Sequence, residues 1–348
     1  MKQVAEVAGV HASTASRALN PSTRSMVAPV VAARVMKAAK QLGYRPDPVA
    51  ASLRTGRSKL VGILVPDIAN ALFAPILSGA SERLSARGYS VIVADVGNDG
   101  GRQLDLAAGL VARRVDGLIL ATVSRDDALV AFCIEQKLPA VLVNRAETEA
   151  RLSAVVSDDA LGMQFAVDHL VQLGHRHIGH LAGPVQHSTG FLRRRGFGHA
   201  LAAHGLDPAL APCEVTMAYT REEGAAAMRR LLDAHPQVTA IACANDLLAL
   251  GAYDVLRERG LECPRDISIV GHNDMPLVDM VQPALTTVRI SHREMGREAA
   301  ALLEQAIEQE DATVRKVVLP SKLIIRGSTA KPRKTSSGAV AARSRKAR

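Results

Sequence analysis

From Leu60 onward, short apolar runs alternate with helical stretches, and this alternation constrains the fold of the chain more than any other feature. Repeated strand–helix units of this kind predict a parallel sheet with helices on both faces. The runs fall into two series, which predict two lobes: LVGILVP, SVIVAD, DGLILAT, PAVLVNR and SAVVSD, then HIGHLAG, AIACAND and DISIVGH. The expected fold class is therefore α/β, with two doubly wound parallel sheets.

Polar side chains follow the predicted strands at their carboxyl ends, where open parallel sheets bind ligands. These residues are Asp67 and Asn70, Asn144 and Arg145, Asn245 and Asp246, and Asn273 and Asp274. The pattern predicts a small-molecule site between the lobes. Asparagines also cap helices, so a purely structural role for several of them stays open.

The first 46 residues are rich in alanine and show helical periodicity broken by glycine. Residues 5–20, AEVAGVHASTASRALN, read as two helices joined by a turn at Gly9, which is the pattern of a helix-turn-helix. Small side chains in the second helix would allow close approach to DNA. Its polar side chains can bond phosphates or base edges, namely Ser13, Thr14, Ser16, Arg17 and Asn20. An ordinary amphipathic helix pair explains this stretch equally well.

Charge is unevenly distributed along the chain, whose formal net charge is +9. Residues 1–59 hold ten Lys and Arg against two acids, giving +8, and residues 331–348 hold seven and no acid, giving +7. Residues 60–330 therefore carry −6. A basic head on an acidic body predicts that the head meets a polyanion. We expect the basic tail to be disordered, with nonspecific nucleic-acid contact as an open alternative.

Longer motifs occur in a specific order from about residue 2 to residue 327. They are VAEVAGVHASTASRALN, AAKQLGYRPDPVAASLRTGRSKLVGILVPDIAN, RRVDGLIL, HLVQLGHRHIGHLAGP, RRRGFGHAL, CANDLLALGA, DISIVGHND and PALTTVRI. In this order they resemble the LacI/GalR (lac repressor) family of bacterial transcriptional regulators. The resemblance implies a helix-turn-helix head at 1–46, a hinge helix and linker at 47–59, a periplasmic-binding-protein-like body at 60–328 that binds effector and dimerises, and a disordered basic tail at 329–348.

The resemblance also implies roles for individual residues. Ala12, Ser13 and Arg17 match the base-reading positions, and His11, Thr14, Ser16 and Asn20 match the phosphate contacts. Leu53 matches a hinge leucine that wedges into the minor groove, although an exposed helix leucine is a common alternative. The implied effector contacts are Asn70, Phe73, Asn144, Arg145, Arg193, Tyr219, Asn245 and Asn273, with a weaker match at His292.

Several features depart from the family pattern. The chain begins almost inside its first helix, which leaves open a natural start upstream of Met1. The loop after Asn20 is about two residues longer than usual, Ala28 and Val31 replace a serine and a threonine, and Pro48 stands early in the hinge helix. Some phosphate contacts are therefore expected to be missing.

Acids are missing from the matched effector positions, because Asn144 and Asn273 stand where sugar-binding relatives often carry Asp. Arg145 and Arg193 then leave the matched set positively charged without a carboxylate. This favours an anionic effector such as a sugar acid or sugar phosphate over a neutral sugar. The alternative is that Asp67, Asp246 or Asp274 balances the arginines.

The sequence gives little support for catalysis, metal binding or a cofactor. His175, His177 and His180 in HRHIGH invite a metal site, but the segment enters a predicted strand, so structural or surface histidines are favoured. The chain shows no P-loop, nucleophile elbow or Cys/His arrangement, so we expect no enzyme and no cofactor.

The remaining features favour a cytoplasmic homodimer that binds operator DNA and a small-molecule effector. The four cysteines are scattered singly, and no long uncharged apolar run predicts a membrane span. The tail lacks apolar heptads, so we expect a dimer rather than a tetramer. A solute-binding protein without DNA regulation is the alternative, which the basic head and the absence of a signal-like N-terminus oppose.

Overall fold

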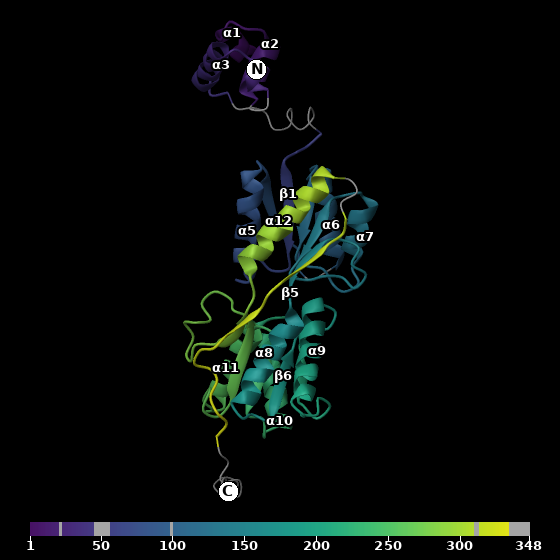
Figure 1. The fold of residues 1–348 in the computed structure, drawn as a ribbon, viewed down its shortest axis with the longest axis vertical. Helices are drawn as coiled ribbons and strands as arrows, with labels where there is room; N and C mark the ends of the chain where they lie inside the picture. The colour runs from purple at the N-terminus through teal and green to yellow at the C-terminus, as the bar shows by residue number, and fades with distance from the viewer. Residues whose placement is uncertain (21–22, 45–55, 98–99, 310–312, 334–348) are drawn as a thin grey trace, which may run out of the picture. The chain divides into compact units, whose positions relative to one another are not determined.

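A computed structural model describes residues 1–20, 23–44, 56–97, 100–309 and 313–333. The chain divides into an N-terminal unit, Met1–Ser58, and a larger unit, Lys59–Arg348 (Figure 1). We call them the head and the body. The expected hinge helix falls mostly on residues 45–55, and both Pro48 and the proposed wedge residue Leu53 lie outside the described residues.

The head is a small helical unit. It comprises α1 (Lys2–Val7), α2 (Ala12–Leu19), the 3-10 turn η1 (Arg24–Met26) and α3 (Pro29–Gln41). Gly9 has φ +61° in the turn between α1 and α2, a conformation that glycine adopts at little cost. Ala15 and Ala18 of α2 are fully buried against Val4 and Val35, so small side chains bring the helices close together. The helix-turn-helix prediction is confirmed.

The first lobe of the body is a parallel sheet in the order β11-β5-β4-β3-β1-β2. Its strands are β1 (Leu60–Val65), β2 (Ser90–Asp95), β3 (Gly117–Leu120), β4 (Ala140–Val143), β5 (Ala154–Ser157) and β11 (Lys316–Leu319). Helices α5 (Phe73–Ala86) and α12 (His292–Glu308) cover one face, and α6 (Gly100–Ala112) and α7 (Ala128–Glu135) cover the other (Figure 1). In β3, Ile119 faces α5 and α12, whereas Leu118 and Leu120 face α6 and α7.

The second lobe has the same layered plan, with strand order β12-β10-β9-β8-β6-β7. Its strands are β6 (Ile178–Ala182), β7 (Cys213–Val215), β8 (Ala240–Cys243), β9 (Ser268–Asn273), β10 (Thr286–Arg289) and β12 (Lys322–Ile324). The pairing is parallel except between β12 and β10. Its helices are α8 (Asp159–Gln172), α9 (Ser188–Ala203), α10 (Arg221–Ala234) and α11 (Asp246–Glu258). The prediction of two doubly wound lobes is confirmed.

The chain passes between the lobes three times, at residue 158, at residues 290–291 and at residues 320–321. The last passage joins β11 of the first lobe to β12 of the second, so one short segment completes both sheets. Sequence analysis did not identify these two strands. Each is half exposed, and neither has the continuous apolar run of a central strand.

Histidines attach the end of the described chain to the second lobe. His175 lies 2.9 Å from the hydroxyl of Thr239 and 2.8 Å from the carbonyl of Ala330, and His169 lies 2.9 Å from the hydroxyl of Thr329. The predicted start of the disordered tail at residue 329 is therefore wrong for Thr329 and Ala330. His180 is buried too, stacked on Phe197 at 4.7 Å.

Two glycines let α5 and α12 touch backbone to backbone. A Cβ on Gly79 would lie 2.0 Å from the carbonyl oxygen of Arg293, and one on Gly296 would lie 2.0 Å from that of Ile76. Among the described residues, no helix is long and apolar enough to cross a membrane.

We expect Gly296→Ala to lower the free energy of unfolding by about 1–3 kcal/mol, because the added methyl group must push the two helices apart. Gly109→Ala is the matched control in α6, where the new Cβ would meet only the flexible guanidinium of Arg113 at 3.4 Å. That control should gain about 0.5–1 kcal/mol from reduced chain entropy. Urea unfolding followed by circular dichroism measures both, and equal effects of the two substitutions would contradict the close contact.

The free energy of unfolding should fall as the pH drops from 6.5 toward 4. Burial lowers the pKa of His180 to about 4, of His187 to about 3 and of His292 to about 4, so the unfolded chain binds more protons in this range. Each histidine contributes on the order of 1 kcal/mol. Burial raises the pKa of Asp246 to about 7 and also raises the pKa of Asp159, and both shifts add stability as the pH falls. Burial lowers the pKa of His169, His175 and His272 as well, so the shifted imidazoles outnumber the shifted carboxyls.

Urea midpoints at pH 7, 6 and 5 test this dependence. His292→Gln removes one shifted imidazole and should make the loss with falling pH shallower than in the wild type. A midpoint that rises toward pH 5 in the wild type would contradict the proposed balance.

Candidate effector and DNA-contact sites

A small cavity of about 30 Å³ lies between the two lobes. It is lined by Pro66, Asn70, Leu72, Phe73, Asn144 and Arg145 from the first lobe and by Thr189, Arg193, Tyr219, Asn245 and Asn273 from the second. The eight residues proposed as effector contacts all line it. The volume suits one or two water molecules, so a larger ligand needs the lobes to separate or the side chains to move.

Arg193, which is 2% exposed, joins four parts of the second lobe around this cavity. Its Nε and Nη2 lie 2.8 and 2.7 Å from Oδ1 of Asp159, its Nη1 donates to the carbonyl of Ala244 at 2.6 Å, and its Nη2 donates to Oδ1 of Asn273 at 3.1 Å. Burial raises the pKa of Asp159, and the Arg193 charge opposes that shift. The expectation that the arginines lack a carboxylate is therefore wrong for Arg193.

The partner of Arg193 was missed because the sequence offers two adjacent acids at the start of α8. Asp158 is the N-cap, and its Oδ1 accepts the Leu161 N–H at 3.0 Å. This leaves Asp159, in the first turn of the helix, to face Arg193. Only the three-dimensional fold distinguishes the two carboxylates.

Asp67, Asp246 and Asp274, which could have balanced the charge of the cavity arginines, have other partners. Asp246 accepts hydrogen bonds from the Thr287 hydroxyl and from the Met275 N–H. Asp274 pairs with Arg289 and Arg326, and Asp67 accepts the Ala69 N–H. Within the described part of the chain, none of the three forms an ion pair with Arg145 or Arg193.

Arg145 is the buried cation of the cavity without a carboxylate partner among the described residues. It is 5% exposed, and its Nη1 donates to the carbonyl of Thr122 at 3.2 Å. Its Nε and the Oδ1 of Asn144 make no hydrogen bond to any described residue. Burial lowers the pKa of Arg145 to about 10, which leaves the side chain charged near neutral pH.

The asparagines of the cavity combine structural and potential ligand contacts. Oδ1 of Asn70 accepts the Leu72 N–H at 3.1 Å, and Oδ1 of Asn245 accepts the Leu248 N–H at 2.9 Å, so both side chains cap local structure. Their amide nitrogens make no hydrogen bond to the described residues and can donate to a ligand. Asn144 and Asn273 have φ of +66° and +112°.

Aromatic rings reach the cavity from both lobes. Phe73 begins α5, and Tyr219 lies over Gly183, where a Cβ would come within 2.3 Å of the ring. The Tyr219 hydroxyl is 3.1 Å from that of Thr189, a lining residue that sequence analysis missed together with Pro66 and Leu72. His292, the weaker match, is buried at the start of α12 and does not line the cavity.

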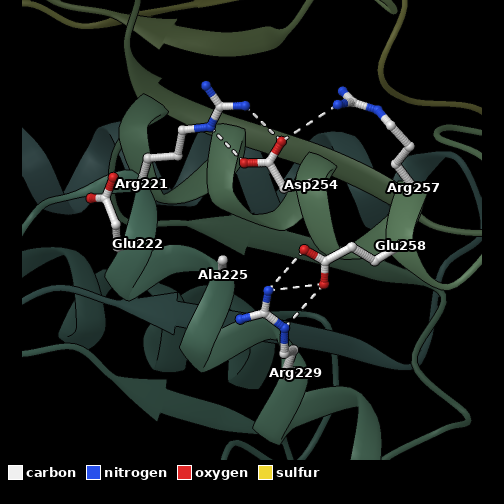
Figure 2. A pocket seen from close by; sticks show the side chains of 7 residues that line it. All are labelled: Arg221, Glu222, Ala225, Arg229, Asp254, Arg257 and Glu258. Carbon is white, nitrogen blue, oxygen red and sulfur yellow. Dashed lines mark hydrogen bonds and ion pairs between the residues drawn. The ribbon is translucent and has the colours of Figure 1, made fainter.

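A larger groove of about 610 Å³ lies between α10 and α11, but most of its charged side chains pair with one another. Figure 2 shows Arg221 paired with Asp254, and Arg229 paired with Glu258. Because these exposed pairs leave few polar groups in need of a partner, we do not assign the groove as the effector site.

In the head, α2 presents polar side chains on its outer side. His11, Ser13 and Arg17 are exposed, and Nδ1 of His11 accepts the Ser13 N–H and so caps the helix. Arg17 makes no side-chain hydrogen bond or ion pair to the described residues. The remaining proposed DNA contacts are half-buried, namely Ala12, Thr14, Ser16 and Asn20.

The start of α3 agrees with the departures seen in the sequence. Ala28 is its N-cap residue and makes no side-chain hydrogen bond, and Pro29 follows at the first helical position. Val31 packs partly buried against the head core. Neither Ala28 nor Val31 carries a hydroxyl group that could contact a phosphate.

Two family descriptions match the chain. The description of bacterial regulatory proteins of the lacI family matches residues 1–47, and that of a periplasmic binding protein-like domain matches residues 167–329. The HTH-type transcriptional regulator CelR of Thermobifida fusca is 34% identical over 338 residues, which span 94% of this chain and 97% of CelR.

Solved structures agree over nearly the same length. The structure described as the transcriptional regulator CelR–cellobiose complex has a TM-score of 0.72 at 34% identity, and covers 94% of this chain and 98% of its own. The lac repressor dimer bound to operator and the anti-inducer ONPF has a TM-score of 0.84 at 28% identity, with the same coverage. Because the similarity extends over head and body alike, the chain belongs to the LacI family of bacterial regulatory proteins.

Proposed function

We propose that the protein is a cytoplasmic transcriptional repressor, without catalytic activity, that binds operator DNA as a homodimer. A small carbohydrate-like effector bound between the lobes controls its affinity for DNA. The observation that carries this proposal is the gathering of the eight polar and aromatic residues around one inter-lobe cavity, in a chain whose head presents an exposed, polar α2.

Recognition of DNA is proposed to rest on α2. Arg17 is exposed, and two of the N–H donors of its guanidinium can bond O6 and N7 of one guanine together. Ser13 and His11 flank it on the outer side of the helix, and the +8 charge of residues 1–59 attracts phosphates. The wedge role of Leu53 remains a proposal, because it lies outside the described residues.

Recognition of the effector is proposed to rest on hydrogen bonds and ring faces. Asn70 and Asn245 offer amide N–H donors, and Phe73 and Tyr219 offer flat apolar surfaces, a combination that suits sugar hydroxyls and C–H faces. Since Asp159 neutralises Arg193, an anionic effector is now supported by Arg145 alone. Neutral sugars and sugar acids are therefore both candidates. The related CelR was solved with cellobiose.

Dimerisation follows from the mode of binding proposed. Two heads reading two half-sites of a pseudopalindrome match a two-fold symmetric pair of chains, and the related lac repressor was solved as a dimer on its operator. Coupling between effector and operator is reciprocal, so an inducer that weakens DNA binding is itself bound less well on DNA.

We expect Arg17→Ala to relax base preference at one position of each half-site and to cost about 1–3 kcal/mol of discrimination there. Arg34→Ala is the matched control, since it removes the same charge from an exposed site on α3. The control substitution should weaken binding to specific and to nonspecific DNA by the same factor. Selection from a random DNA library, followed by fluorescence anisotropy at several salt concentrations, measures both. A library with no enriched site would favour the solute-binding alternative.

Arg145→Leu should abolish the effector response and leave operator binding intact, because it removes a buried charge from the cavity and leaves the head unchanged. Thermal shifts with neutral sugars, aldonates, uronates and sugar phosphates identify the responsive class in the wild type. If Arg145→Leu loses the response to sugar acids and sugar phosphates but keeps the response to neutral sugars, Arg145 contacts a carboxylate or phosphate of the ligand. A full response in the variant would show that the cavity is not the effector site.

A further inference from the structure

Two loops of the first lobe contact one segment of the second. The loop between β3 and α7 carries Arg125, and the loop after β4 carries Ala146. The Arg125 N–H donates to the Gln186 carbonyl at 2.8 Å, just before α9, and the Ala146 N–H donates to the Ser188 hydroxyl at 3.0 Å, in the first turn of α9. The first lobe therefore holds the start of α9 at two points.

A ring contact adds to these two hydrogen bonds. The guanidinium carbon of Arg125 lies 3.8 Å from the centroid of the Phe191 ring, also in the first turn of α9. This guanidinium makes no hydrogen bond or ion pair to the described residues, so the ring is the group that holds it. A cation over an aromatic face is attracted by the ring quadrupole. The contact thus joins one side chain of each lobe.

Hydrogen bonds within the first lobe fix the backbone around Arg125. The Arg125 carbonyl accepts the Thr148 N–H at 2.8 Å. Next to it, the carboxylate of Asp127 accepts the N–H groups of Ser124 and Leu129 at 2.6 and 2.9 Å. None of these three bonds needs the second lobe. The Arg125 side chain is therefore presented from an ordered loop, which reduces the entropy lost when it meets the ring.

The contact between Arg125 and Phe191 lies away from the passages between the lobes. In the first sheet β3 lies three strands from β11, and in the second sheet β6 lies four strands from β12. At a strand spacing of about 4.8 Å, these separations are roughly 14 and 19 Å. A rotation at the passages would therefore part Arg125 from Phe191, while the bonds within each lobe stay intact.

These contacts adjoin the inter-lobe cavity. Arg145 and Thr189 line the cavity, and each is the chain neighbour of a residue in the hydrogen bond from Ala146 to Ser188. At about 30 Å³ the cavity has room for one or two water molecules. Separating the lobes to admit a larger ligand would break this hydrogen bond and the contact of Arg125 with the ring.

We propose that Arg125 and Phe191 form a clasp that holds the two lobes closed in the ligand-free protein and opens to admit the effector. The regulatory role of the clasp rests on the effector site proposed above. Its strength sets the fraction of molecules with an open cavity, and the apparent affinity for a ligand falls in proportion to that fraction. Neither residue lines the cavity, so both are assigned to opening and closing and not to ligand contact.

Hydrogen exchange of the full chain without ligand tests the clasp. The Ala146 N–H is bonded across the lobes, so it exchanges when they part. Arg125→Ala removes the guanidinium and keeps the backbone N–H, and should speed exchange at Ala146 about threefold to tenfold. Exchange at Leu129 should be unchanged, because its N–H is bonded to Asp127 within the first lobe. Mass spectrometry with fragmentation to single residues distinguishes the two amides.

Arg195→Ala is the matched control. Arg195 lies one turn after Phe191 on α9, with its guanidinium 5.8 Å from the centroid of the same ring, so it is a cation near the ring that belongs to the same lobe. Its removal should leave exchange at Ala146 unchanged. Phe191→Leu removes the ring but keeps an apolar side chain, and should act like Arg125→Ala.

Unchanged exchange at Ala146 in Arg125→Ala and Phe191→Leu would overturn the clasp while the proposed effector site stands. Equal acceleration at Ala146 and Leu129 would show that Arg125 stabilises only its own loop, and would overturn the clasp too. Equal acceleration in Arg195→Ala would have the same consequence. Because exchange is measured without ligand, a protein that binds no carbohydrate would contradict the proposed function and leave the exchange result unaffected.

Discussion

The buried ion pair between Arg193 and Asp159 fixes the second-lobe side of the effector cavity. One guanidinium joins the start of α8, the middle of α9, the loop before α11 and the end of β9, through Asp159, Ala244 and Asn273. Burying a charged pair costs free energy of desolvation, and a good ion-pair geometry with further hydrogen bonds is needed to offset that cost. The orientation of Asn273 toward the cavity depends on this network, and so does the identity of the charge that a ligand encounters.

Neutralising Arg193 shifts the electrostatic character of the site to the first lobe. Arg145 keeps its charge without a carboxylate partner among the described residues, and it lines the inter-lobe cavity. Charge complementarity, taken from residue types alone, therefore pointed toward an acid more strongly than the contacts do.

Much of the fold was predictable from the sequence because central strands such as β1 and β4 are continuous apolar runs, and their polar carboxyl ends mark the ligand side of a parallel sheet. The cavity residues Asn144, Asn245 and Asn273 follow directly from that rule. The features that could not be predicted depend on contacts between residues far apart in the sequence. In the sequence, Asp159 resembles a helix cap, and only the fold shows that it pairs with Arg193 of α9. Thr122 likewise resembles the last residue of a strand. The strands β11 and β12 are short and half exposed, and they are recognised only by their pairing with the two sheets.

The three passages between the lobes lie next to one another. Ser157 pairs with Leu319 across β5 and β11, and Arg289 pairs with Lys322 across β10 and β12, so adjacent strands leave one lobe and enter the other together. The three passages therefore form one strip of chain between the lobes. Asp159 follows the first passage directly and pairs with Arg193 of the same lobe, so the ion pair belongs to the second lobe on its side of the passages. A rotation of one lobe against the other would therefore bend all three passages together, at one edge of the cavity.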